Sequence, residues 1–89
     1  MKEIRTTRAF LRDLKLAGRR GKSLVKIEAL IESLAQGKKL APRHRPHRLK
    51  GQLAGLWECH IEPDWLLLWE DGPHAITLVR CGTHADLFD

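Results

Sequence analysis

The stretch from Gly55 to Glu70 constrains the fold of this chain more than any other part of the sequence. It contains two arms rich in Leu, Ile and Trp, which favour β-strands, on either side of the turn-forming residues Glu62-Pro63-Asp64. This pattern predicts a β-hairpin. With the first two of these residues at the tip, His60 faces Trp65 across the strand pair, and Asp64 lies beside them. The hairpin therefore gathers an imidazole, a carboxylate and an indole at its closed end, where we expect chemistry.

The chain has 89 residues, of which 43% are hydrophobic and 30% are charged. This length and balance predict one domain, residues 1–89, with a single core and an open surface groove rather than an enclosed cavity. No apolar run is long enough to cross a bilayer and no secretory signal follows Met1, so we expect a cytoplasmic protein without a membrane partner. Cys59 and Cys81 lack metal or redox spacing, which predicts two reduced core residues.

Positive charge is clustered along the chain. The 16 Lys and Arg residues outnumber the 11 Asp and Glu residues, which gives a formal net charge of +5 at pH 7. Two basic segments, residues 19–22 and residues 38–50, hold many of these cations. Clustered cations favour a polyanionic partner over a merely soluble surface. We therefore expect the partner to be a nucleic acid or an acidic protein.

Two amphipathic helices are expected in the first half of the chain. Thr6 or Thr7 can cap the first helix, which should stop at Gly18. Ser23 can cap the second helix, and Gly37 should end it. The apolar positions of the two helices are Phe10, Leu11, Leu14, Ala17, Leu24, Ile27, Leu30, Ile31 and Leu34. The short connection predicts an antiparallel pair whose shared apolar side needs a flat surface to cover it.

Strand signals occupy most of the remaining sequence. We expect strands at residues 2–6, at residues 47–50, in the two hairpin arms and at residues 75–81. A basic connection with two prolines precedes the second strand. The resulting order is β-α-α-β-β-β. We predict an α+β fold in which both helices pack on one face of a small, largely antiparallel sheet and leave the other face free.

Histidines are the most informative residues outside the hairpin. Of the five in the chain, His47, His60 and His84 lie beside expected turns or strand ends, and the other two are expected to be ordinary surface residues. Histidine can accept or donate a proton near neutral pH. Cleavage of RNA by its own 2′-hydroxyl needs a base, an acid and nearby cations. These three histidines and Asp64 supply that chemistry.

A metal site is a weaker alternative for the same residues. His44 and His47, with Cys59 or His60, could hold a zinc ion, but the spacing is loose and no second ligand pair follows. We therefore expect no metal and no other cofactor.

The tryptophans and the C-terminal segment allow further expectations. Because the helices can bury only one face of the hairpin arms, at least one of Trp57, Trp65 and Trp69 should be exposed for stacking on unpaired bases. The segment Gly82–Phe88 either packs its apolar end on the core or turns His84 back toward the strand ends.

Three ordered blocks of this chain resemble the RelE/ParE superfamily of bacterial toxins, and within it the YafQ-like mRNA interferases of type II toxin–antitoxin systems. The blocks are His47-x-Leu49-x-Gly51, Glu58 to Leu67, and Gly82 to Phe88, and the resemblance covers essentially the whole chain. It implies a microbial RNase-like fold, ribosome-dependent cleavage of messenger RNA, and neutralisation by a cognate antitoxin.

The resemblance also implies roles for individual residues. The family's functional positions fall on His47, His60, Asp64 and His84, with Trp65 and Phe88 shaping or contacting the substrate site. We expect His60 and His84 to transfer protons, without deciding which is acid and which is base. His47 should contact the phosphate, and Asp64 should orient a histidine.

The chain departs from the family pattern at two positions. Trp57 stands where family members often carry arginine, and Trp69 stands where tyrosine is usual. We therefore expect phosphate binding by Arg48, Lys50 or Arg80.

Two alternative functions compete with a metal-free endoribonuclease that acts on messenger RNA at the ribosome. A ParE-like protein would poison DNA gyrase by binding alone, and a plain nucleic-acid-binding module would leave the histidines without a role. The set of His47, His60 and His84 favours the endoribonuclease, because neither alternative depends on histidines.

Overall fold

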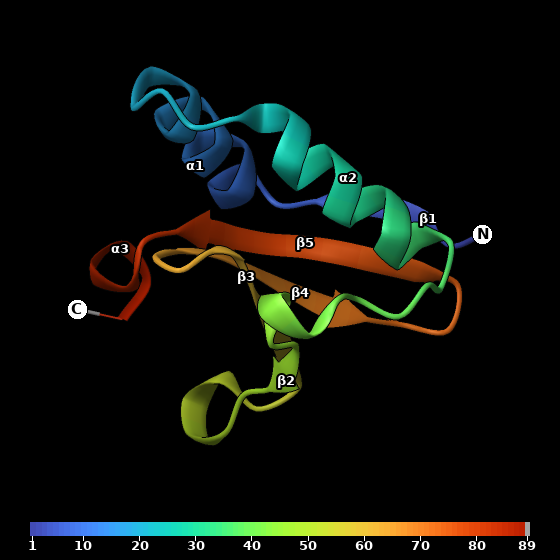
Figure 1. Ribbon diagram of the computed structural model, residues 1–89. Helices are drawn as coiled ribbons and strands as arrows, with labels where there is room; N and C mark the ends of the chain where they lie inside the picture. The colour runs from blue at the N-terminus through green and yellow to red at the C-terminus, as the bar shows by residue number, and fades with distance from the viewer. Residues whose placement is uncertain (89) are drawn as a thin grey trace.

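A computed structural model describes residues 1–88 as a five-stranded sheet with two helices along one face (Figure 1). The elements are β1 (Glu3–Thr6), α1 (Arg8–Arg19), α2 (Leu24–Ala35), β2 (His47–Arg48), β3 (Leu56–Glu62), β4 (Trp65–Asp71), β5 (Ala75–Gly82) and α3 (His84–Phe88), with 3₁₀ turns at Pro42–His44 and Gly51–Leu53. This confirms the predicted α+β class and the order β-α-α-β-β-β. The short helix α3 was not expected from the sequence.

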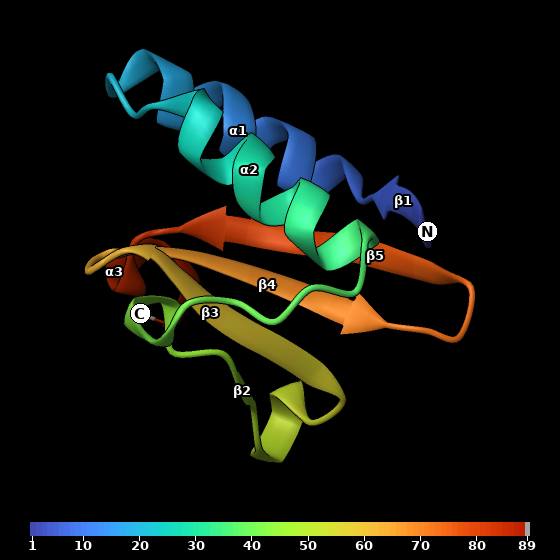
Figure 2. The ribbon, with the colours of Figure 1, turned by 45° about the vertical axis from the view of Figure 1, so that its right-hand side comes forward.

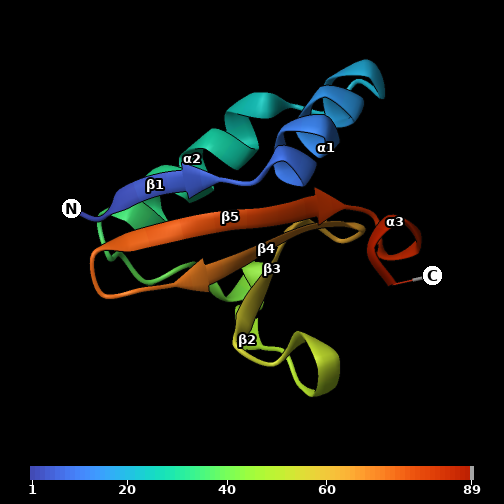
Figure 3. The ribbon, with the colours of Figure 1, turned by 180° about the vertical axis from the view of Figure 1, so that it is seen from behind.

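The sheet is mixed, because the first strand pairs with the last. Its order is β1-β5-β4-β3-β2, in which β1 runs parallel to β5 while the other neighbours are antiparallel. Figure 3 shows β1 beside β5 from behind. The prediction of a largely antiparallel sheet is confirmed. The two long helices lie in the connection that leads from β1 to the other strands.

The hairpin of β3 and β4 exists, but its predicted tip was wrong by one residue. His60 pairs with Leu66 and Glu62 pairs with Trp65, so Ile61 is the extra residue of a bulge. The tip is therefore Pro63 and Asp64, and His60 does not face Trp65. Ile61 lies in the core with 6% exposure, as alternation from Cys59 requires, and the bulge sets Glu62 opposite Trp65, where it binds Lys22 and Lys26.

Both helices begin where the sequence indicated. The Oγ1 of Thr7 accepts a hydrogen bond from the backbone N–H of Phe10 at 3.0 Å, and it donates to the carbonyl of Val79 at 2.7 Å. The first helix continues through Gly18 to Arg19, one residue beyond the predicted stop. Figure 2 shows α1 and α2 side by side over the same face of the sheet.

The core fills the space between these helices and the sheet. The most deeply buried apolar side chains there include Phe10, Ile27, Cys59, Trp65, Leu67, Trp69, Ile76, Leu78 and Cys81. Trp65 and Trp69 are at most 4% exposed, and Trp57 is half-buried against the core. The prediction of an exposed tryptophan was therefore wrong, because all three tryptophans lie on the face of the hairpin that the helices cover.

The two cysteines are free and buried, as predicted. Burial raises the pKa of each thiol, Cys59 and Cys81, to about 12. They are therefore protonated core residues at neutral pH. Among the described residues, no helix is long and apolar enough to span a membrane.

Candidate active site

The candidate site lies on the face of the sheet away from the two long helices. Side chains of a β-strand alternate between the two faces, so Cys59 points into the core while Glu58 and His60 point to the other side. Strand β2 pairs with β3 in a register that sets His47 opposite Glu58. The helix α3, which follows β5, brings His84 to the same end of the sheet.

His84 is held by Asp64 through two hydrogen bonds. Its ring Nδ1 lies 2.6 Å from Asp64 Oδ1, and its backbone N–H donates to the same oxygen at 2.9 Å. Both hydrogen bonds lower the pKa of the Asp64 carboxyl, and the bond from the backbone N–H has the larger effect. Because a carboxylate can only accept, the ring proton sits on Nδ1 and leaves Nε2 of His84 to exchange a proton with a substrate.

His60 lies next to His84, with 5.7 Å between the ring centroids. Its Nδ1 lies 3.1 Å from the carbonyl oxygen of Pro63 and therefore donates to it. The hairpin tip thus orients both rings, since Pro63 holds His60 and Asp64 holds His84. The structure brings together the two residues that were predicted to transfer protons.

Glu58 links His60 to His47 and was missed by the sequence analysis as a functional residue. Its carboxylate is 6% exposed, 3.3 Å from Nε2 of His47 and 3.9 Å from Nε2 of His60. Nδ1 of His47 donates to the carbonyl of Arg45 at 3.0 Å, which leaves its Nε2 facing the Glu58 carboxylate. The signal in the sequence was the two-residue spacing from His60, which puts both side chains on one face.

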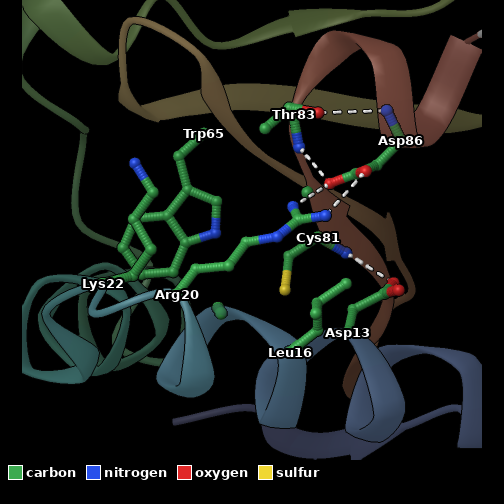
Figure 4. A pocket seen from close by; sticks show the side chains of 10 residues that line it. Asp13, Leu16, Arg20, Lys22, Trp65, Cys81, Thr83 and Asp86 are labelled. Carbon is green, nitrogen blue, oxygen red and sulfur yellow. Dashed lines mark hydrogen bonds and ion pairs between the residues drawn. The ribbon is translucent and has the colours of Figure 1, made fainter.

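Helix α3 is fixed by a reciprocal cap and an ion pair, both visible in Figure 4. The N–H of Thr83 donates to Asp86 Oδ2 at 3.0 Å, and the N–H of Asp86 donates to Thr83 Oγ1 at 3.0 Å. Arg20 of the α1 end binds both oxygens of Asp86, at 2.7 and 3.4 Å. The Arg20 guanidinium and the Thr83 N–H lower the pKa of Asp86 to about 2.

Glycine at position 82 permits this arrangement. A Cβ added to Gly82 would lie 2.9 Å from the Cβ of Asp86, which is closer than real side chains approach. The helix therefore turns tightly off β5 and presents Phe88, which is 43% exposed and 6.5 Å from the ring of His84. Phe88 thus lies beside His84 and is not tucked onto the core.

Two residues expected at the substrate site do not reach it. Trp65 is 1% exposed and packs in the core, so it cannot contact RNA. Arg80 gives its Nε and Nη2 to Asp13, at 2.6 and 3.1 Å. This ion pair ties β5 to α1 and removes Arg80 from the candidate phosphate ligands, which is a correction to the prediction.

The other two predicted phosphate contacts differ in position. Arg48 lies over the ring of Trp57, 5.3 Å from its centroid, on the core face of the sheet and not on the face of His47 and Glu58, which is a further correction to the prediction. Lys50 is exposed in the turn after β2. The zinc alternative is wrong with respect to Cys59, because this thiol is fully buried on the opposite face of the sheet from His60. Within residues 1–88, no three His, Cys, Asp or Glu side chains are grouped to hold a metal ion.

Comparison with known proteins agrees with this fold. A family model described as "Bacterial toxin of type II toxin-antitoxin system, YafQ" matches residues 2–89. The class is therefore that of bacterial toxins of type II toxin–antitoxin systems. Within this class, the chain belongs to the YafQ family.

Individual relatives cover the same length. The mRNA interferase toxin YafQ of Escherichia coli K12 is 32% identical over 88 residues, which cover 98% of this chain and 96% of that protein. The crystal structure of YafQ from E. coli BL21(DE3) superposes with a TM-score of 0.95 at 30% identity, over 100% of both chains. YafQ in the E. coli DinJ–YafQ toxin–antitoxin complex superposes with a TM-score of 0.92 at 31% identity, over 99% of this chain and 98% of that one.

Proposed function

We propose that this toxin is an mRNA interferase that cuts messenger RNA on the ribosome by attack of a 2′-hydroxyl on the adjacent phosphate. The observation that carries the proposal is the pair of His60 and His84, 5.7 Å apart, each with its Nδ1 proton committed to an acceptor of the hairpin tip. Both rings therefore keep Nε2 for the substrate. A reaction that removes a proton from the attacking oxygen and donates one to the leaving oxygen requires two such groups.

Side chains of the protein can carry out both proton transfers of the reaction. One of the two histidines takes the proton from the 2′-hydroxyl as the O2′–P bond forms, and the other gives a proton to the 5′-oxygen as the P–O5′ bond breaks. The products are a 2′,3′-cyclic phosphate and a 5′-hydroxyl. Asp64 holds the ring of His84 in position through its Nδ1.

His47 lies beside the proton-transfer pair, where its Nδ1 donates to the Arg45 carbonyl and its Nε2 faces the Glu58 carboxylate. A histidine ring can carry positive charge, and we assign His47 to contact with the phosphate oxygens, on which negative charge develops. Lys50 adds an exposed positive charge in the turn after β2.

Replacement of His84 by alanine tests the proposal. We expect His84→Ala to lower the rate of messenger RNA cleavage on translating ribosomes by about 10²- to 10⁴-fold, because it removes one proton-transfer group. The fold should persist, since His84 is exposed. His74→Ala is the matched control, because His74 is also exposed but lies at the turn between β4 and β5. Cleavage by His84→Ala at the rate of the parent would refute the mechanism.

The same proposal includes a partner and a place. We propose that a cognate antitoxin, a partly disordered acidic chain, covers the basic surface of the toxin, because a net charge of +5 favours an acidic chain that folds on binding. DinJ is the antitoxin of the E. coli relative. Because the proposed substrate is on the ribosome, we expect the toxin to act in the cytoplasm. A pull-down experiment tests this partner. The toxin should bind the acidic product of a neighbouring gene, and it should no longer cleave messenger RNA when that protein is bound.

A further inference from the structure

A basic turn beside the proposed catalytic pair has no role so far. This basic turn comprises Pro42–Arg45, a 3₁₀ turn that ends with Arg45 in the left-handed conformation, at φ 47°. Nδ1 of His44 lies 2.7 Å from the carbonyl oxygen of His60, to which it donates. The basic turn is thereby anchored to the strand that carries His60.

The anchored turn and the hairpin tip enclose an open cavity of about 360 Å³. Its lining consists of Arg43, His44, Arg45, His60, Ile61, Glu62 and Pro63. This volume lies within the range of small-ligand sites, roughly 300 to 1,000 Å³. Because His60 is part of the wall, a chain that passes the catalytic pair can continue directly into the cavity.

The charge of the cavity is positive. Its carboxylate, Glu62, is held at 2.9 Å by each of Lys22 and Lys26, and these hydrogen bonds lower its pKa. The positive charges of these two lysines therefore offset the negative charge of Glu62. Within residues 1–88, no carboxylate lies within 4 Å of the guanidinium groups of Arg43 and Arg45. Both arginines are exposed and available to an anion.

We propose that this cavity is a subsite for the nucleotide next to the cleaved bond, with Arg43 and Arg45 binding its phosphate. The proposal rests on the proposed ribonuclease function and extends it to substrate binding. Arginine suits this task, because its planar guanidinium can bind two phosphate oxygens at once. The left-handed turn at Arg45 holds the two arginines on one short, anchored segment, so little ordering is needed when RNA binds.

Charge removal at the basic turn tests the subsite. The variants are Arg43→Ala, Arg45→Asn and their combination, since asparagine tolerates the left-handed conformation better than alanine does. For messenger RNA cleavage on ribosomes, we expect KM to rise about tenfold in each single variant and about a hundredfold in the double variant, with kcat unchanged. The control is Arg12→Ala with Lys15→Ala, which removes two exposed charges from α1.

A binding assay separates the subsite from the catalytic proposal. The probe is a short single-stranded RNA with a 2′-deoxy sugar at the cleaved position, which cannot be cut. We expect the double variant to bind it more weakly and to show a smaller salt dependence, with the slope of log K against log salt reduced by about 0.7 for each lost phosphate contact. The α1 control should bind as the parent does.

The possible results point in different directions. If the parent does not cut RNA but the double variant loses binding, the ribonuclease proposal fails, and the basic turn stands only as an RNA-binding site. If the double variant cuts with the KM of the parent, the subsite is wrong. If it keeps that KM but no longer binds an acidic antitoxin, the basic turn is a protein-binding surface. If the parent neither cuts nor binds RNA, both proposals fail.

Discussion

The two faces of the sheet differ sharply although they are made from the same strands. On the face toward α1 and α2, β3 and β4 contribute Cys59, Ile61 and Leu67, which are at most 6% exposed and belong to the core. On the other face the same strands contribute Glu58 and His60. The helix face therefore holds the main core, whereas the other face carries the candidate chemistry beside the buried Leu66 and Leu68, so it is not left free as predicted.

The difference shows how a chain of 89 residues can hold a reactive site without an enclosed pocket. The alternation of a strand lets adjacent residues serve opposite purposes. Rigid packing on the helix face fixes the backbone, and that backbone fixes the imidazoles on the other face. The three predictions below test this division, from the largest expected effect to the smallest.

The adjacent residues Leu66 and Leu67 offer the strongest test. Both are fully buried, but Leu67 pairs with Cys59 and Cys81 on the core face while Leu66 pairs with His60 and Gly82. We expect Leu67→Ala to lower the free energy of unfolding by about 2–5 kcal/mol through loss of contacts and a cavity. Its kcat should stay close to that of the parent at temperatures where it is folded.

Leu66→Ala is the companion measurement. Because Leu66 pairs directly with His60 across the two strands, we expect the variant to have a lower kcat as well as a lower stability. Urea unfolding and ribosome cleavage assays measure the two quantities separately. Equal loss of kcat in both variants would show that the two faces are not functionally separate.

Glu58→Gln tests the charge on the catalytic face. The amide keeps the shape of Glu58 but removes the negative charge beside His47 and His60. We expect kcat/KM to fall about 10- to 100-fold, as for loss of a charge-assisted hydrogen bond, with a change in unfolding free energy below about 1 kcal/mol. Glu58→Asp should restore part of the rate, whereas a purely structural role would affect stability and leave kcat/KM of the folded protein intact.

The smallest effect concerns Asp86 at low pH. Its folded pKa of about 2 lies below the ordinary value of 3.8, so its contribution to stability is present above about pH 4 and is lost as the pH falls toward 2. With allowance for solvent screening, we expect this loss to be about 1 kcal/mol. Urea unfolding at pH 5, 3 and 2 should therefore show a smaller decline for Asp86→Asn than for the parent. The same decline in both proteins would contradict a role for the Arg20 ion pair.

Much of the candidate site could be predicted from the sequence. Histidines beside turns and strand ends, together with the family resemblance, indicated His47, His60, Asp64 and His84, and the structure brings these four side chains to one face. Element type and order followed from apolar spacing, caps and turn residues. These signals are local, which is why the sequence carries them.

Long-range features were harder to predict. The one-residue bulge at Ile61, the parallel pairing of β1 with β5 and the burial of Trp65 all depend on packing between distant segments. Helix α3 is too short for a periodic signal, although Thr83 followed three residues later by Asp86 is a recognisable capping pattern. Arg80 was assigned to phosphate because its partner on α1 lies 67 residues away.

The pairing of β1 with β5 also affects how the toxin is made. Glu3 meets Ala75 in this pair, and Thr7 bonds to Val79 across 72 residues of sequence. While a ribosome is still extending the chain, β1 has no neighbour, and we expect a protease to digest stalled chains that end before β5. His84, which we propose to transfer a proton, emerges later still. We therefore expect a toxin that is still being translated to be inactive toward its own transcript.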